Sequence, residues 1–130
     1  MIDDNAAFLR AAQRVIANMP ELELAGIASD AAAGLELVSK ARPDVVLIDI
    51  QMPGMNGFEL AARLRKSPAA PAMVLISSHV DGETLREAER LGVPAVLPKH
   101  DFVEGLRLAL ARASAARNGS APRPKGALNR

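Results

Sequence analysis

The stretch RPDVVLIDIQMPGMNGFEL, residues 42–60, decides the fold. Its apolar run 45–48 is continuous rather than alternating, which is typical of a strand that is covered on both faces of a parallel sheet. The run ends at Asp49, and a turn-rich segment separates it from the helical spacing of Leu60 and Leu64. Because an uncompensated charge at the end of a buried strand is costly, Asp49 is a candidate functional residue.

Outward from this stretch, strand-like and helix-like segments alternate along the chain. Apolar runs predict strands over 22–28, 45–48, 72–77 and 93–98. Helical spacing predicts helices over about 6–18, 31–40, 58–66 and 82–91, and a last helix from about 102. Since the connections are short, this alternation predicts an α/β fold: a doubly wound parallel sheet with helices on both faces.

Length, charge and composition restrict the class of protein. The 130 residues suffice for one domain, which we expect over 1–116, followed by a basic, disordered tail over 117–130 that contains Pro, Gly and Ser. The chain has no cysteine and no apolar run of about 18 residues, so we expect a cytoplasmic protein without a membrane segment or thiolate metal site. Because the tail contributes +4 to a net charge of +1, residues 1–116 carry −3. This acidic body, with only three aromatic residues, argues against direct nucleic acid binding.

Polar side chains stand at the predicted strand ends and near the start of the chain, namely Asp3, Asp4, Asp49, Ser77 and Lys99. In a doubly wound sheet, ligands bind beyond the carboxyl ends of the strands, so these side chains should meet at one edge. Carboxylates about 4 Å apart repel by roughly 4 kcal/mol per pair at intermediate dielectric unless a cation lies among them. Mg²⁺ suits such a site, because it binds few carboxylates, keeps several waters and accepts phosphate oxygens. With a hydroxyl and an ammonium nearby, the set is typical of phosphoryl transfer.

Four segments in order resemble the receiver domain of bacterial two-component response regulators: IDDN (2–5), PDVVLIDIQMPGMNGFEL (43–60), VLISS (74–78) and LGVPAVLPK (91–99). The resemblance covers about residues 2–113 and is greatest to the branch that often carries a C-terminal helix-turn-helix DNA-binding domain. It implies a flavodoxin-like fold of five parallel strands in the order 2-1-3-4-5. The first strand is shortened here, because only Met1 and Ile2 precede the acidic pair.

The resemblance also implies a role for each candidate residue. Asp49 would be the phosphoacceptor, with Ser77 and Lys99 contacting the phosphoryl group. Mg²⁺ would be held by Asp4, by Asp49, by the backbone carbonyl of Gln51 and, through water, by Asp3. The protein would therefore not be an enzyme beyond Mg²⁺-dependent phosphoryl transfer to its own Asp49 and slow autodephosphorylation.

Partners follow from the same resemblance. The phosphoryl group would come from a sensor histidine kinase or a phosphotransfer protein. The output would be a downstream protein target, a C-terminal DNA-binding domain that lies outside this chain, or a homodimer. In each case phosphorylation would switch partner binding or dimerisation.

Two other interpretations stay open. A phosphatase or phosphotransferase of the dehalogenase-like type also uses an Asp at a strand end, but Gln51 stands where those enzymes have the second Asp of D-x-D, so their general acid is missing. A receiver-like interaction domain that is never phosphorylated is the second alternative. It would fit if the short first strand disables switching, or if Val96 does so by replacing the aromatic residue that many receivers have there.

Overall fold

The structure, a computed structural model, describes residues 1–120. Its core is a parallel sheet of strands β1 (Val45–Asp49), β2 (Ala72–Ser77) and β3 (Val96–Pro98), in the order β1-β2-β3. Isolated parallel bridges extend the sheet beyond β1, because Ile2 pairs with Ile48 on one side and with Ala28 on the other. The spatial order is therefore Ala28, Ile2, β1, β2, β3, which confirms the predicted order 2-1-3-4-5, with the first two strands reduced to single bridges.

The predicted strand over 22–28 is wrong except at Ala28. A strand needs a neighbouring ladder, and only Met1 and Ile2 lie between this segment and β1. The Met1 amino group donates a hydrogen bond to the Gly26 carbonyl at 3.0 Å, and Ala28 donates to the Met1 carbonyl at 2.9 Å. A cavity of about 400 Å³ opens beside this segment, lined in part by Leu22, Leu37, Val45 and Leu106.

The first four helices each begin directly after a capping side chain. The helices are α1 (Ala6–Ala17), α2 (Ala31–Ala41), α3 (Gly57–Arg65), α4 (Gly82–Arg90) and α5 (Phe102–Ser120), the last preceded by the 3₁₀ turn η1 (Lys99–Asp101). The side chains of Asn5, Asp30, Asn56 and Asp81 each accept a hydrogen bond from a backbone N–H in the first turn of the helix that follows. From β1 onward, strands and helices alternate along the chain, as the sequence predicts.

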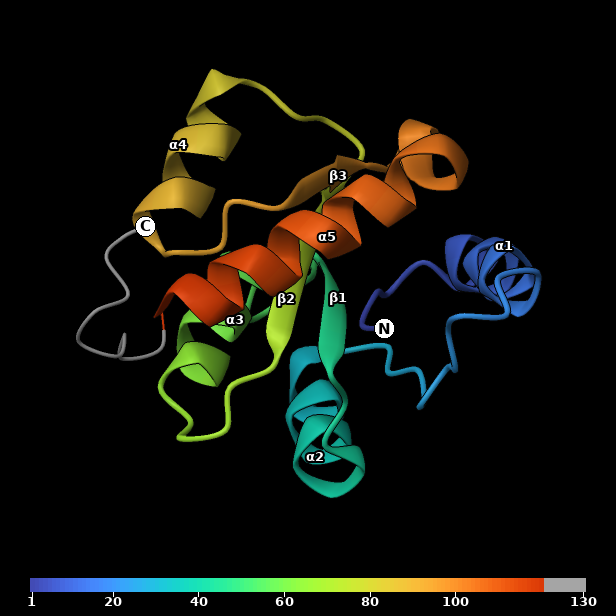
Figure 1. The fold of residues 1–130 in the computed structure, drawn as a ribbon, viewed down its shortest axis with the longest axis horizontal. Helices are drawn as coiled ribbons and strands as arrows, with labels where there is room; N and C mark the ends of the chain where they lie inside the picture. Colours follow the sequence, from blue (N-terminus) through green and yellow to red (C-terminus); the bar gives the residue numbers. More distant parts are fainter. Residues whose placement is uncertain (121–130) are drawn as a thin grey trace.

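The helices cover both faces of the sheet. In Figure 1, α5 crosses in front of the strands; it shares one core with α1 and with the sheet residues Leu47, Val74 and Ile76. The opposite core joins α2, α3 and α4 to Ile48 and Leu75. Neighbouring residues in β1 and β2 thus point to opposite faces and are buried on both, which explains why the apolar runs are continuous.

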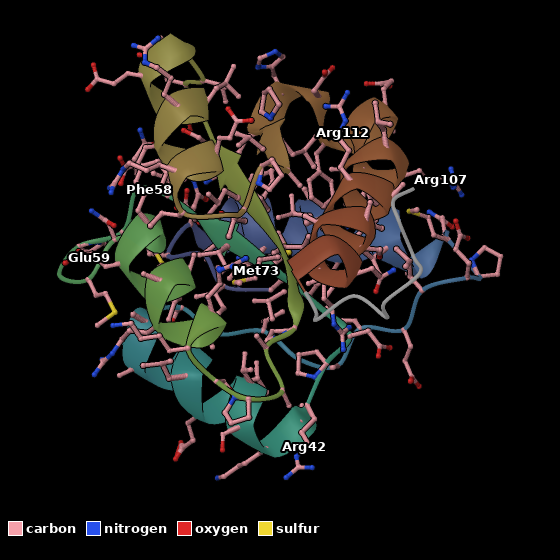
Figure 2. The ribbon with its side chains drawn as sticks, turned by 60° about the vertical axis from the view of Figure 1, so that its left-hand side comes forward. Arg42, Phe58, Glu59, Met73, Arg107 and Arg112 are labelled. Atoms are coloured by element: carbon pink, nitrogen blue, oxygen red, sulfur yellow. The ribbon has the colours of Figure 1, made fainter. Side chains whose placement is uncertain are left out.

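Figure 2 shows this layering from a second side, with Met73 of β2 between α3 and α5, and Arg107 and Arg112 on α5. Helix α5 reaches Ser120, inside the stretch 117–130 that the sequence assigns to a tail. The rest of that predicted tail, 121–130, lies outside the described residues. No helix in the described part of the chain is both long and apolar enough to cross a membrane.

Candidate functional site

The predicted site residues meet at the carboxyl edge of the sheet. Asp49 ends β1, Ser77 ends β2, and Lys99 follows β3 directly. Asp3 follows Ile2, which pairs with Ile48 of β1. The Ile2 N–H donates to the Leu47 carbonyl, and the Ile2 carbonyl accepts the Asp49 N–H. Parallel strands with a common register end together, so side chains far apart in the sequence converge here.

The acidic pair is not needed to begin α1. Asn5 is the N-cap, because its side chain accepts the Phe8 N–H at 3.0 Å. Asp3 is fully buried, and its Oδ1 accepts the Asn5 N–H at 2.8 Å. Its Oδ2 accepts no hydrogen bond of good geometry, but lies 2.8 Å from the Lys99 Nζ. Asp4 is exposed beside it, so the pair presents one buried and one open carboxylate.

Three carboxylates form one cluster, since oxygens of Asp3, Asp4 and Asp49 lie within 4.8 Å of one another. Asp49 is only 2% exposed. Its Oδ1 accepts the Gln51 N–H at 3.3 Å, and its Oδ2 lies 3.6 Å from the Lys99 Nζ. The Lys99 ammonium therefore pairs with two of the three acids, Asp3 and Asp49.

The surroundings of Asp49 disfavour its ionised form. Burial first, and then the neighbouring Asp3 carboxylate, raise the pKa of Asp49 to about 7, although the Lys99 ammonium and the Gln51 amide oppose the change. Extra positive charge at the carboxylate oxygens would relieve this penalty. The three carboxylates, with an open side at Asp4, fit a hard divalent cation that prefers oxygen ligands.

Ser77 is buried, and its hydroxyl is held by a local turn. The Oγ donates to the His79 carbonyl at 2.8 Å and accepts the His79 N–H at 3.1 Å. The Gln51 Oε1 lies 3.4 Å from the same Oγ. A hydroxyl has one hydrogen, so Ser77 must release the His79 carbonyl before it can donate to another group. The His79 ring is exposed and lies 3.4 Å from the Asp81 carboxylate.

Two residues at the site were not predicted from the sequence. The Phe8 ring lies under the Lys99 ammonium, with 4.6 Å between the Nζ and the ring centroid. The sequence pattern only identifies Phe8 as one apolar residue of a helix. The available signal is its place in the first turn of the helix that follows the acidic pair.

The second is Gly57, the first residue of α3. A Cβ built at this position would lie 2.3 Å from the Asp49 backbone oxygen and 2.7 Å from the Ile50 Cα. The Gly57 N–H donates to the Ile50 carbonyl at 2.9 Å, so α3 begins directly against the end of β1. The signal for it is the Asn56-Gly57 pair, in which Asn56 forms a capping box with Glu59.

The chain is similar in sequence to known proteins. Residues 1–111 match the response regulator receiver domain family. The nitrate/nitrite response regulator protein NarL of Escherichia coli K12 is 32% identical over 115 residues, which are 88% of this chain and 53% of that protein. A protein-glutamate methylesterase/protein-glutamine glutaminase of Burkholderia thailandensis is 34% identical over 82% of this chain and 31% of its own length. The chain thus spans about half, or less, of these curated relatives.

Solved structures give the same result. The signal receiver domain of NarL from Mycobacterium tuberculosis is similar with a TM-score of 0.71 and 30% identity, over 84% of this chain and 92% of that one. The chemotaxis protein CheY4 of Vibrio cholerae has a TM-score of 0.77 at 24% identity, over 86% of this chain and 93% of that one, and so shares the fold. The family match, the relatives and the fold agree, and the chain belongs to the response regulator receiver domain family.

Proposed function

We propose that this receiver domain accepts a phosphoryl group on Asp49 in a Mg²⁺-dependent reaction and thereby switches partner binding or dimerisation. The observation that carries the proposal is the environment of Asp49. This carboxylate is buried beside Asp3 and Asp4 and lies 3.6 Å from the Lys99 ammonium. A buried nucleophile surrounded by groups that can balance phosphoryl charge suits phosphoryl transfer, which depends mainly on positioning and charge neutralisation.

The residues that would hold Mg²⁺ are Asp4, Asp49, the Gln51 backbone carbonyl and, through water, Asp3. When bound, the cation would keep Asp49 ionised and neutralise charge on the phosphoryl oxygens. Asp4 is the exposed member of the cluster, which suits a ligand that meets the ion from the solvent side. Asp3 is held by the Asn5 N–H and by Lys99, which suits a less direct role.

In the proposed reaction, an oxygen of Asp49 attacks phosphorus on a phosphohistidine of a sensor kinase or phosphotransfer protein. The P–N bond breaks, and the histidine leaves with the electron pair and takes up a proton. Lys99 turns from Asp3 toward the new phosphoryl oxygens, and Ser77 leaves the His79 carbonyl to donate to one of them. Water later hydrolyses the acyl phosphate and restores the Asp49 carboxylate.

Similarity suggests where this reaction belongs. Curated relatives include response regulators and methylesterases, each much longer than this chain, so a further output domain or a separate protein target would supply the response. We infer a cytoplasmic receiver over 1–116, with 117–130 as a linker or tail. We do not assign the chain a methylesterase or other enzymatic role. It covers only 31% of the length of one methylesterase relative and 27% of another.

The test is the intact mass of the protein after incubation with acetyl phosphate, with and without Mg²⁺. We expect one phosphoryl group to be added only with Mg²⁺, none in Asp49→Asn, and a higher Mg²⁺ requirement in Asp4→Ala. Circular dichroism should show that both variants keep the fold. Labelling of the Asn variant would contradict the assignment of Asp49.

A domain that acts only by binding a partner is the second candidate. It is favoured by the reduction of the first strand to a bridge at Ile2, and by Val96, a half-buried aliphatic residue in β3. A folded wild-type protein that gains no phosphoryl group from acetyl phosphate or from a phosphorylated kinase would support this candidate. The dehalogenase-like alternative would require a general acid, and Gln51 cannot supply one.

A further inference from the structure

The Lys99 ammonium lies close to two carboxylates and to one aromatic ring. It lies 2.8 Å from Asp3 Oδ2, 3.6 Å from Asp49 Oδ2 and 4.6 Å from the centroid of the Phe8 ring. The Lys99 side chain is 14% exposed, so little water reaches it. A cation within about 6 Å of an aromatic centroid is attracted by the ring face, and more strongly when it is partly desolvated.

Two contacts hold Phe8 in place, one at its backbone and one at its ring. The Phe8 backbone N–H donates to the Asn5 side chain, which sets the first turn of α1 directly after the acidic pair. Its ring packs edge to face against Phe102, with 5.3 Å between the centroids and an angle of 83°. Phe102 is buried and begins α5, immediately after the turn that carries Lys99. The aromatic pair therefore joins the two segments that supply Asp3 and Lys99.

We propose that Phe8 is a positioning residue for phosphoryl transfer: its ring holds the Lys99 ammonium over the Asp3–Asp49 edge and excludes water from it. The inference rests on the proposed function of Asp49 as phosphoacceptor. On phosphorylation, Lys99 would move only from Asp3 to the phosphoryl oxygens of Asp49, with the ring still covering its other side. Without the ring, the four-carbon side chain could adopt more positions in which it does not contact the phosphoryl group.

A purely structural role for Phe8 is the alternative, because the ring also packs against the core that α1 and α5 share. The two roles differ in what can replace the ring. Packing needs apolar volume, which leucine largely supplies. Attraction to the ammonium needs an aromatic face, which tyrosine keeps and leucine lacks.

The experiment therefore compares Phe8→Leu, Phe8→Tyr and the matched control Phe58→Leu, which removes a half-buried ring from α3 on the opposite face of the sheet. The initial rate of phosphorylation by acetyl phosphate is measured at saturating Mg²⁺ by intact mass. We expect Phe8→Leu to lower the rate about fivefold, while Phe8→Tyr and Phe58→Leu stay within about twofold of the wild type. In NMR spectra, the Lys99 ε-methylene protons should show an upfield ring-current shift in the wild type and Phe8→Tyr, and lose it in Phe8→Leu.

The outcomes separate the positioning role from the proposed function. A wild type that is phosphorylated on Asp49, with Phe8→Leu as fast as wild type, would overturn the role of Phe8 alone. Equal loss of rate in Phe8→Leu and Phe8→Tyr, or in Phe8→Leu and Phe58→Leu, would overturn it in favour of packing. A folded wild type that gains no phosphoryl group would overturn the proposed function itself, and the positioning role with it. If Phe8→Leu does not fold, the rate and ring-current shift of Phe8→Tyr decide, and loss of both would contradict the proposal.

Discussion

The two ends of the pairing between the N-terminal residues and the segment 22–28 differ sharply. At the carboxyl end, Ile2 forms bridges to Ala28 and Ile48, and the buried Asp3 follows it at the edge of the site. At the other end, residues 22–26 have no strand partner, and a cavity of about 400 Å³ lies beside them. On the N-terminal side, the pairing is thus limited to the residue next to Asp3, and the single bridge at Ile2 holds Asp3 beside the end of β1.

A change at the bridge itself should have the largest effect. Ile2 is 1% exposed and packs against α2, where a Cβ built on Gly34 would lie 2.6 Å from the Ile2 Cδ1. We expect Ile2→Ala to lower the free energy of unfolding by about 3 kcal/mol, from lost burial plus a new cavity. Urea unfolding followed by circular dichroism measures this change.

The matched control is Leu24→Ala at the other end, where the side chain is 37% exposed. We expect a loss of less than about 0.5 kcal/mol there. Equal losses at Ile2 and Leu24 would contradict the contrast between the two ends.

The next largest effect concerns the neighbouring end of β1. In Gly57→Ala, the new Cβ would meet the Asp49 backbone oxygen at 2.3 Å, and backbone cannot rotate away as a side chain can. We expect a loss of about 2 kcal/mol in unfolding free energy and a lower rate of Asp49 phosphorylation. The control is Gly54→Ala in the loop before α3, where nothing lies within 4 Å of the added Cβ, although the positive φ of 78° still strains it. A normal rate in Gly57→Ala would show that this close contact does not position Asp49.

These two regions also explain what the sequence could predict. The strands at 45–48 and 72–77 were predicted correctly because both of their faces are buried, which leaves a continuous apolar run. The segment 22–28 has the composition of a strand, but a strand also requires a partner ladder, and composition does not report whether one is present. Pro94 likewise lacks an N–H, and β3 begins only at Val96.

The candidate site follows the same division. Asp3, Asp4, Asp49, Ser77 and Lys99 were predicted because their side chains carry chemistry at strand ends, and the fold brings them together. Phe8 and Gly57 were missed because neither is chemically reactive. Their importance depends on a ring 4.6 Å from an ammonium and on a missing Cβ, and only the three-dimensional structure shows such proximity.

A smaller effect tests the electrostatics at the site edge. Since the pKa of Asp49 is raised to about 7, the unfolded chain releases this proton at lower pH than the folded protein does. Without Mg²⁺, stability should therefore fall as the pH rises from about 4 to 7, and the full penalty should be present above pH 7. Because solvent and Lys99 screen the charge, we expect Asp49→Asn to be more stable by about 1–2 kcal/mol at pH 8 and unchanged at pH 3.5. Urea unfolding at both pH values measures this, and a variant less stable at pH 8 would contradict the sign.

The smallest effect is expected beyond the cavity, at an ion pair on the surface. The Arg107 Nε lies 2.7 Å from the Glu21 carboxylate, and this hydrogen bond lowers the pKa of Glu21. Both side chains are well exposed, so solvent and salt screen the attraction between them. Arg107→Gln should change the unfolding free energy less than any substitution above, and the small difference should vanish in acid, where Glu21 is protonated in both states. Unfolding at low and high salt measures it, and a loss as large as that of Ile2→Ala would show that this pair, rather than the bridge, holds the weakly paired end of the sheet in place.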